Sequence, residues 1–128
     1  MGAQAAASIV LHRVYLRSFK RLGFLVDSRH LRRTMMQGQT AVQRGFDFIH
    51  AGVRFQVKAN RPSGKPGSRV TLVSKASSLE FDQLVWLLYD PRFELQEAWQ
   101  LDVDFYRREL RDLKRLGPDH YRRGNRLV

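Results

Sequence analysis

A glycine-containing pair between two strand-like runs is the feature that most limits how this chain can fold. Residues 45–50 and 53–60 are rich in β-branched and aromatic residues, and Ala51-Gly52 separates them. A two-residue connection with a glycine between such runs is typical of a tight β-hairpin. We therefore predict a hairpin whose loop is Ala51-Gly52.

This hairpin fixes which side chains share a face. With a two-residue loop, Asp47 lies opposite Gln56. Because side chains alternate along a strand, Gln56 and Lys58 project to one face and Val57 to the other. Asp47, Gln56 and Lys58 are therefore predicted to form one polar patch, and a one-residue slip would move Asp47 to the opposite face. The simpler interpretation of the same residues is an exposed cross-strand ion pair between Asp47 and Lys58.

The N-terminal region has the periodicity of a surface helix. Its apolar stripe is Leu11, Tyr15, Phe19 and Leu22, and its basic stripe is Arg13, Arg17, Lys20 and Arg21. Gly23 is expected to end this helix, and residues 24–26 are expected to form a short first strand. The basic stripe is interpreted either as a phosphate contact or as a solvated face.

Beyond the hairpin, the sequence predicts an exposed loop and three more strands. Two prolines and two glycines forbid a regular element in residues 60–68, and their spacing does not match a P-loop. We expect this loop to be a flexible flap beside the polar patch. Strands are predicted at 69–73, 84–89 and 93–98. The continuous apolar run 84–89 indicates a central strand covered on both faces.

The last predicted element is a helix that begins at Asp102 or Asp104 and stops at Gly117-Pro118. Its inward stripe is expected to be Tyr106, Leu110 and Leu113. A basic tail of about residues 119–128 follows, interpreted as a phosphate contact or as disorder. The chain is thus predicted to be a single α/β domain over 1–128, with a mixed sheet of about five strands flanked by an N-terminal and a C-terminal helix.

Charge is the strongest compositional signal. The formal net charge of the 128 residues is +11. Residues 1–79 hold 14 basic and 2 acidic residues, giving +12, whereas residues 80–128 hold 9 basic and 10 acidic residues, giving −1. A concentrated positive field attracts polyanions such as nucleic acid, although basicity can also serve only solubility. The candidate nucleic-acid contacts are Arg29, Arg32, Arg33, Arg44, Arg61, Lys65 and Arg69.

Other classes of protein are disfavoured by composition. The chain has no cysteine, which excludes disulfides and thiolate chemistry and fits a reducing compartment, so we expect a cytoplasmic protein. The residues after Met1 do not read as a signal peptide, and the apolar stretch 8–26 carries four basic residues, so no membrane association is expected. The four histidines lack the spacing of a zinc site.

A resemblance to a known family emerges from the hairpin sequence. Gly45-Phe46-Asp47, followed by Phe55-Gln56-Val57-Lys58, resembles the core of the PD-(D/E)XK nuclease superfamily in its Q-x-K variant. Residues 81–90 and 93–98 are similar to the later strand pair of those variants. The resemblance spans about residues 23–98.

This resemblance implies a restriction-endonuclease-like fold and a Mg²⁺-dependent endodeoxyribonuclease, which would act in restriction, repair or mobile-element biology. Asp47, Gln56 and the backbone carbonyl of Val57 would bind Mg²⁺ or Mn²⁺, and Lys58 would orient the attacking water or stabilise transition-state charge. The implied partner is nucleic acid, most simply DNA, and a homodimer is compatible with the family.

The sequence also departs from the family pattern. The family's first helix commonly supplies a glutamate to the metal site, but no acidic residue precedes Asp27 in this chain. Gln4 and His12 are the polar stand-ins. Three interpretations stay open: the acid precedes Met1, the site works with fewer anions, or the chain is a non-catalytic nucleic-acid-binding protein with a degenerate nuclease fold.

Overall fold

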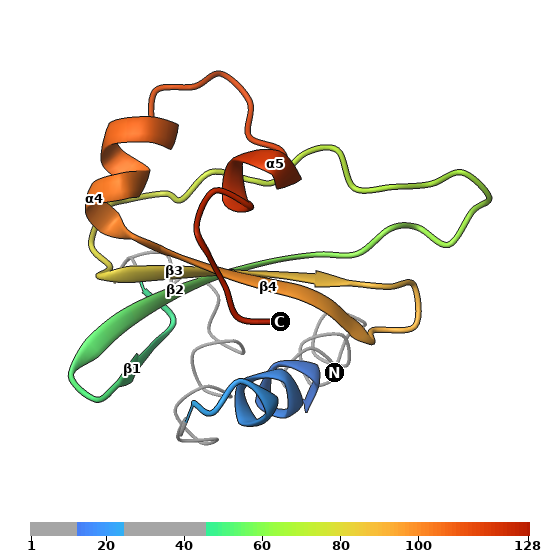
Figure 1. Cartoon of the computed structure of the whole chain (residues 1–128), viewed down its shortest axis with the longest axis horizontal. Helices are drawn as coiled ribbons and strands as arrows, with labels where there is room; N and C mark the ends of the chain where they lie inside the picture. Colours follow the sequence, from blue (N-terminus) through green and yellow to red (C-terminus); the bar gives the residue numbers. More distant parts are fainter. Residues whose placement is uncertain (1–12, 25–45) are drawn as a thin grey trace, which may run out of the picture.

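The computed structural model describes residues 13–24 and 46–128. A five-stranded sheet in the order β1-β2-β3-β4-β5 forms its centre (Figure 1). The strands are β1 (Phe48–His50), β2 (Val53–Asn60), β3 (Gln83–Tyr89), β4 (Leu95–Asp102) and β5 (Asn125–Arg126). The β2–β3 pair is parallel and the other three pairs are antiparallel. The predicted α/β class with a mixed sheet of five strands is confirmed.

The predicted hairpin forms, and its register is as predicted from the loop back to Phe48. Phe48 pairs with Phe55, and His50 pairs with Val53 next to the loop. Ala51 and Gly52 both have positive φ, 52° and 77°. Two such residues in succession make a turn whose twist matches that of the flanking strands. The glycine therefore marks a turn that the backbone requires.

Strand β3 is the buried centre of the sheet, as its apolar run predicts. Its side chains alternate between two hydrophobic clusters, with Leu84 and Trp86 in one and Val85 and Leu87 in the other. All four are fully buried. Both faces of β3 are therefore covered, and β2 and β4 flank it on either edge.

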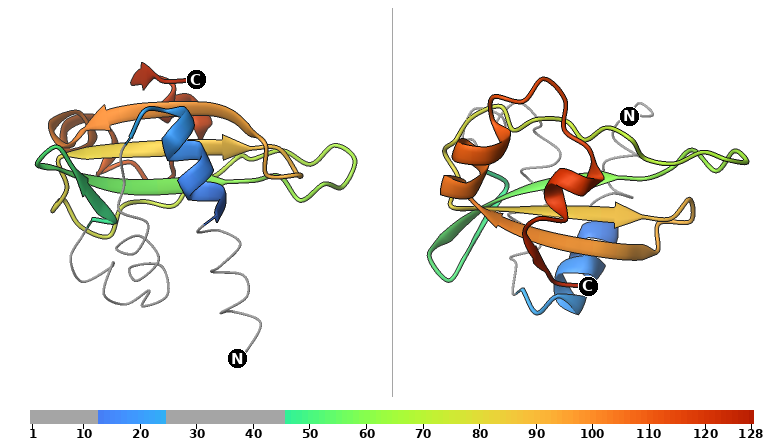
Figure 2. Two further views of the ribbon diagram at one scale, coloured as in Figure 1. Left: turned by 90° about the horizontal axis from the view of Figure 1, so that it is seen from below. Right: turned by 45° about the horizontal axis from the view of Figure 1, so that its top comes forward.

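One face, called here the lower face, is covered by the helix of residues 13–21 (Figures 1 and 2). This helix ends at Gly23, which has a φ of 84°. The N–H of Phe24 bonds the carbonyl of Phe19, and the N–H of Gly23 bonds that of Lys20. This pair of bonds is a Schellman cap, completed by contact between the rings of Phe19 and Phe24. The predicted end of the helix at Gly23 is confirmed.

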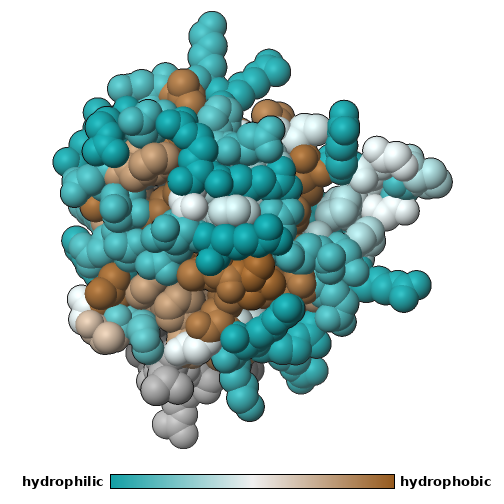
Figure 3. Space-filling view, viewed as in Figure 1, coloured by the Kyte–Doolittle hydropathy of each residue, from teal (hydrophilic) through white to brown (hydrophobic). Residues whose placement is uncertain are grey.

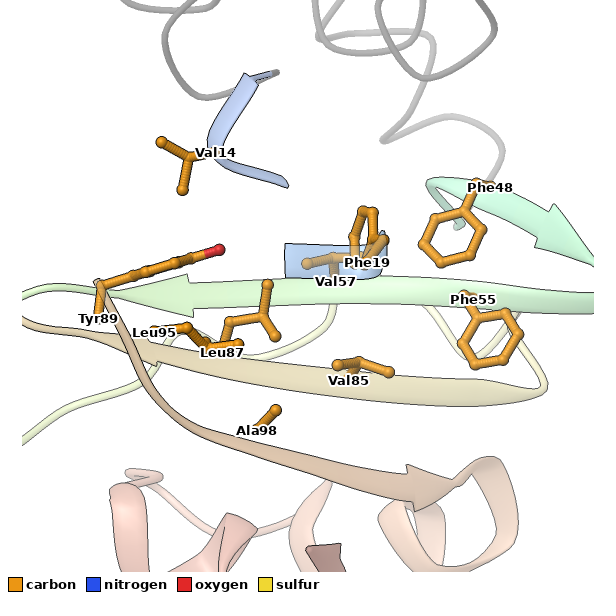
Figure 4. Close-up of a cluster of buried hydrophobic side chains, with 10 residues drawn as sticks. All are labelled: Val14, Phe19, Phe48, Phe55, Val57, Val85, Leu87, Tyr89, Leu95 and Ala98. Atoms are coloured by element: carbon orange, nitrogen blue, oxygen red, sulfur yellow. The ribbon is translucent and has the colours of Figure 1, made fainter. Parts of the chain in front are cut away.

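The hydrophobic cluster that contains Val85 and Leu87, called here the lower-face cluster, joins this helix to the sheet (Figure 4). Phe19 from the helix meets the stacked rings of Phe48 and Phe55 from the hairpin. At the other end of the cluster, the hydroxyls of Ser18 and Tyr89 lie 2.6 Å apart. Burial of so much aromatic surface is the main force that holds the helix in place.

The opposite, upper face is covered by the C-terminal helices (Figure 2). These are α4 (Val103–Phe105), a π-helical turn η1 (Tyr106–Leu110) and α5 (Pro118–Tyr121). Asp102 caps the start, because its Oδ1 accepts the N–H of Phe105 at 2.7 Å. The second cluster, called here the upper-face cluster, joins these helices to β3. In it, Leu84 and Trp86 of the strand pack against Tyr106, Leu110 and Tyr121.

Two predictions about the C-terminal region are wrong, and one of the two alternatives for the tail is excluded. The helix ends at Leu110, well before Gly117, and Leu113 is 37% exposed and does not face the core. The i→i+5 bond from the Arg111 N–H to the Tyr106 carbonyl widens the last turn, which shifts the apolar stripe. The tail is not simply a disordered extension: Tyr121 is buried, and Asn125–Arg126 add the fifth strand.

Two predicted strands also differ from the structure. Residues 69–73 form no strand, since only Val73 makes an isolated bridge, to Leu116. The strand predicted at 93–98 begins at Leu95 and continues to Asp102. Phe93 has a φ of 63° and belongs to the preceding turn. Of the predicted strand at 24–26, residues 25 and 26 lie outside the described residues.

The parallel strands β2 and β3 are joined by residues 61–82. Their first part, residues 61–72, projects beyond the sheet as a long loop, called here the finger (Figure 1). Its two arms are tied by a hydrogen bond between the hydroxyls of Ser63 and Ser68, and by one from the Asn60 amide to the carbonyl of Leu72. The finger is mostly exposed and lies at the end of β2 that follows Lys58.

Candidate functional site

Asp47 lies at the open edge of β2, just before β1 begins. Its Oδ2 accepts a hydrogen bond of 2.7 Å from the backbone N–H of Val57. In an antiparallel pair, this N–H would bond to the neighbouring strand, but β1 pairs with β2 only from Phe48 onward. The carboxylate therefore takes the place of a missing strand residue and satisfies a main-chain donor.

The predicted pairing of Asp47 with Gln56 does not occur. The N–H of Asp47 donates to the carbonyl of Phe55 at 2.7 Å, although Phe55 is already the partner of Phe48. Two successive residues thus share one partner, as at a β-bulge. This displacement brings the Asp47 carboxylate to the edge of β2, where it reaches Val57.

Gln56 and Lys58 lie where the alternation of β2 predicts. Phe55 and Val57 belong to the lower-face cluster, so Gln56 and Lys58 project to the upper face. Both are partly buried. The predicted patch is thus assembled in part: Gln56 and Lys58 share a face, and Asp47 lies at the adjacent edge.

The charges of Asp47 and Lys58 influence one another without direct contact. Burial raises the pKa of Asp47, while the bond from Val57 and the charge of Lys58 act in the opposite direction. Burial likewise lowers the pKa of Lys58, and the charge of Asp47 opposes this shift. No salt bridge joins the two side chains among those of the described residues. The ion pair offered as the simpler interpretation is therefore not formed.

A second acid near the patch is already engaged. Asp82, just before β3, accepts hydrogen bonds from the Arg54 side chain at 3.1 and 3.2 Å and from the Arg54 N–H at 2.8 Å. The hydrogen bonds from the Arg54 side chain are the main reason that the pKa of Asp82 is lowered. This pair was not predicted, because nothing in the sequence indicates that residues 54 and 82 are neighbours.

Metal binding at the patch would depend on few oxygen atoms. Asp47 Oδ1 makes no hydrogen bond with another described residue, and the carbonyl of Val57 points to the same edge as its N–H. The Gln56 amide adds a neutral oxygen. The described part of the chain contains no group of three or more His, Cys, Asp or Glu side chains able to hold a metal ion. The residues fit Mg²⁺ only as a weak site with a single carboxylate.

The predicted nucleic-acid contacts fall into two groups. Lys65 and Arg69 are exposed on the finger, and Arg61 is exposed at its base. Arg61 is engaged, because it donates to the carbonyl of Pro91 at 2.8 Å and lies 4.3 Å from the centre of the Phe93 ring. The others lie outside the described residues, as do the two stand-ins for the missing acid: Arg29, Arg32, Arg33, Arg44, Gln4 and His12.

Arginines on the N-terminal helix have a role that the sequence did not reveal. Arg17 donates to the carbonyl of Phe93 and Arg21 to that of Leu95, each at 3.3 Å. Together with Arg61, they hold the turn between β3 and β4. Arg17 and Arg21 are therefore structural ties and are less available for phosphate contact.

No family model matches this chain, and no curated protein matches its sequence. Within the ranges 13–24 and 46–128, no helix has the length and apolar character needed to cross a membrane. The resemblance to PD-(D/E)XK nucleases thus stays a prediction from the hairpin motif, and the function has to be argued from the site.

Proposed function

We propose that this protein is a metal-dependent nuclease that hydrolyses phosphodiester bonds in DNA, in a restriction-endonuclease-like fold. The observation that carries the proposal is the placement of Asp47, Gln56 and Lys58 around the outer edge of β2. A carboxylate, an amide and an ammonium group lie along the middle of β2, and the basic finger follows the end of this strand.

In this proposal, Asp47 Oδ1, the Gln56 amide oxygen and the Val57 carbonyl would hold Mg²⁺ or Mn²⁺. The bound ion would supply an activated water and positive charge near the reacting phosphate. Oxygen atoms of the phosphate would complete the coordination, so metal affinity would rise when DNA binds. The hydrogen bond from Val57 orients the Asp47 carboxylate, which leaves its other oxygen for the metal.

Lys58 would act on the phosphate or on the attacking water. Its lowered pKa results from burial, and a partly desolvated ammonium interacts more strongly with a developing negative charge than a solvated one. Lys65 and Arg69 would contact the DNA backbone. Such a protein would work in the cytoplasm, and a homodimer would present two sites to a duplex.

A second candidate is a non-catalytic nucleic-acid-binding protein with the same fold. The specific observation in its favour is that Asp82 is neutralised by Arg54, which leaves Asp47 as the patch's one available carboxylate among the described residues. The basic surface would then be the functional feature, and the patch would serve the stability of the sheet edge.

Cleavage of supercoiled plasmid and of single-stranded DNA in Mg²⁺, Mn²⁺ or EDTA tests the proposal. The nuclease predicts metal-dependent cleavage that is lost in Asp47→Asn and in Lys58→Met. Asp47→Asn is suitable because Asn keeps an oxygen to accept the Val57 N–H. Lys114→Gln, a change at an exposed residue outside the patch and the finger, is the control that should cleave like the unchanged protein.

An absence of cleavage, together with salt-sensitive binding that survives Asp47→Asn, would favour the non-catalytic candidate. Cleavage that continues in EDTA would contradict the metal-dependent mechanism.

A further inference from the structure

Two adjoining grooves lie on the upper face between the finger and α5. One has a volume of about 430 Å³ and includes Ser68, and the other has a volume of about 370 Å³ and includes Thr71 and His120. Arg69 and Arg122 line both, so the two form one continuous groove. The right-hand view of Figure 2 shows α5 and the finger segment on the same side of the sheet.

The acidic side chains of this groove are already engaged. Both oxygens of Glu97 accept from Arg122, each at 2.8 Å, and Asp119 accepts from Arg122 at 3.0 Å. Asp90 Oδ1 accepts two backbone N–H groups of its own turn. Arg122 offsets one of these negative charges, and each of the three carboxylates has its own partners, so none of them occupies Arg69.

By contrast, two hydrogen-bond donors of the groove bond to no other residue within 13–24 and 46–128. Arg69 is exposed and makes no hydrogen bond or ion pair within the part of the chain that the structure describes. His120 Nδ1 accepts the N–H of Gly117 at 2.9 Å, so the neutral ring carries its proton on Nε2. Arg69 and His120 are therefore the groups with which this part of the groove can bind an anion.

From this arrangement we infer that the groove binds a phosphate group of a nucleic-acid strand, with Arg69 and His120 as donors. The planar guanidinium of arginine matches phosphate oxygens. The projecting right-hand part of the molecule in Figure 3 is pale to light teal, so this side carries no large hydrophobic patch. Because the inference takes its ligand from the nucleic-acid partner of the proposed function, it rests on that proposal.

The position of the groove suits a second contact on one bound strand. It opens on the face to which Gln56 and Lys58 project, and Pro62 in its lining follows Lys58 by four residues. At about 3.3 Å per residue, the chain from Lys58 to Pro62 spans at most roughly 13 Å. A strand that crosses the patch would therefore reach the groove within a few nucleotides.

Binding can be measured in EDTA, where cleavage cannot occur. We would titrate ¹⁵N-labelled protein with a short single-stranded oligonucleotide, with its uncharged methylphosphonate analogue and with inorganic phosphate. The inference predicts chemical-shift changes at Arg69, Thr71 and His120 with the charged oligonucleotide and none with the analogue. Arg69→Gln should weaken binding about 10-fold, which is the lower end of the effect of losing one charge-assisted contact.

The variants are chosen to separate binding from folding. Arg69→Gln alters an exposed side chain, and His120→Asn keeps an acceptor for the Gly117 N–H, so both should retain dispersed spectra. Lys114→Gln, which removes one positive charge from an exposed residue that lines neither groove, is the matched control and should bind like the unchanged protein. Equal affinity of all three variants for the charged oligonucleotide would overturn the inference.

Inorganic phosphate that shifts the same residues while the oligonucleotide does not would also overturn it, in favour of a small-anion site. Failure of the nuclease proposal is a separate result. Groove binding without metal-dependent cleavage rejects the nuclease and keeps the inference, whereas cleavage without groove shifts rejects the inference alone.

Discussion

Arg122 holds Glu97 through two parallel hydrogen bonds, from Nε to Oε1 and from Nη2 to Oε2, each 2.8 Å long. This bond pair links the segment after α5 to the middle of β4, residues that are far apart in the sequence. Bidentate pairs of this kind are among the stronger charge interactions in proteins. The packing of the C-terminal helices on the upper face therefore depends in part on Glu97 being ionised.

We predict that stability decreases in acid because of Glu97. The bonds from Arg122 lower the pKa of Glu97 to about 2. A lowered pKa in the folded state means that the carboxylate stabilises the fold above the ordinary pKa of about 4.5 and that this contribution disappears as the pH falls toward 2. Glu97→Gln should lose roughly 1–2 kcal/mol of unfolding free energy at pH 7 and almost nothing near pH 2.

Urea unfolding at pH 7, 4 and 2.5 measures this difference. Glu94→Gln is the control, because the exposed Glu94 side chain makes no hydrogen bond or ion pair with another described residue. A gap between Glu97→Gln and the unchanged protein that stays constant down to pH 2.5 would contradict the prediction.

Asp47 should show the opposite dependence on pH. Burial raises the pKa of Asp47, so its ionised form destabilises the fold, and stability should decrease as the pH rises through that pKa. Asp47→Asn keeps the bond to Val57 without the charge and should be at least as stable at pH 7. Asp47→Ala leaves the Val57 N–H unsatisfied and should lose roughly 1–3 kcal/mol.

Thermal unfolding of the two Asp47 variants between pH 4 and 8 tests this. A loss of stability in Asp47→Asn as large as that in Asp47→Ala would show that the carboxylate charge, and not only its role as acceptor, supports the fold. Greater stability in Asp47→Asn combined with lost cleavage would instead be the signature of a charge kept for function.

The basic residues of the finger should divide into those that stabilise the fold and those that bind nucleic acid. Arg61 is bonded to Pro91 and stacked on Phe93, so Arg61→Gln should lower the melting temperature. Lys65→Gln and Arg69→Gln should leave it unchanged. Each of the latter two should reduce the slope of log affinity against log salt by about 1, which corresponds to one lost phosphate contact.

Fluorescence anisotropy with a labelled oligonucleotide at several salt concentrations, beside thermal melts of the same samples, gives both readouts. The division is wrong if Arg61→Gln changes the salt slope while its melting temperature stays the same.

Gly124 should tolerate no side chain. A Cβ at this position would lie 2.5 Å from the backbone oxygen of Gln100 and would clash with Leu101 Cδ2. The backbone cannot move without disturbing the β4–β5 pair, so Gly124→Ala should destabilise the protein by about 1–3 kcal/mol. Asn125→Ala, which changes an exposed side chain on the adjacent residue, is the control for urea unfolding.

Local signals in the sequence predicted the local structure well. Gly52 and Gly23 marked the hairpin turn and the helix cap, and the apolar run around Trp86 marked the central strand. Each of these depends on residues close together in the chain. The strand predicted at 69–73 failed because these residues pair with no strand of the sheet, and only Val73 finds a partner, in the bridge to Leu116.

The candidate site was predictable only in part, for a related reason. Alternation along β2 placed Gln56 and Lys58 correctly, but the bulge at Asp47 depends on how the chain approaches the sheet. The bonds of Arg54 to Asp82 and of Arg17 to Phe93 join residues 28 and 76 positions apart. Periodicity carries no information about such pairs. For Arg17 it predicts only a place in a solvated or phosphate-binding stripe.

The parallel pairing of β2 with β3 has a consequence for how the chain reaches this fold. The β1–β2 hairpin and the β3–β4 hairpin each have short connections and can form early and independently. The two hairpins pair only when residues 61–82 close a long loop between them. Closing this loop lowers the conformational entropy of the chain, and no local contact offsets that loss. The joining of two preformed halves is therefore expected to limit the folding rate, and until it occurs the apolar edge of β3 stays open to pairing with other chains.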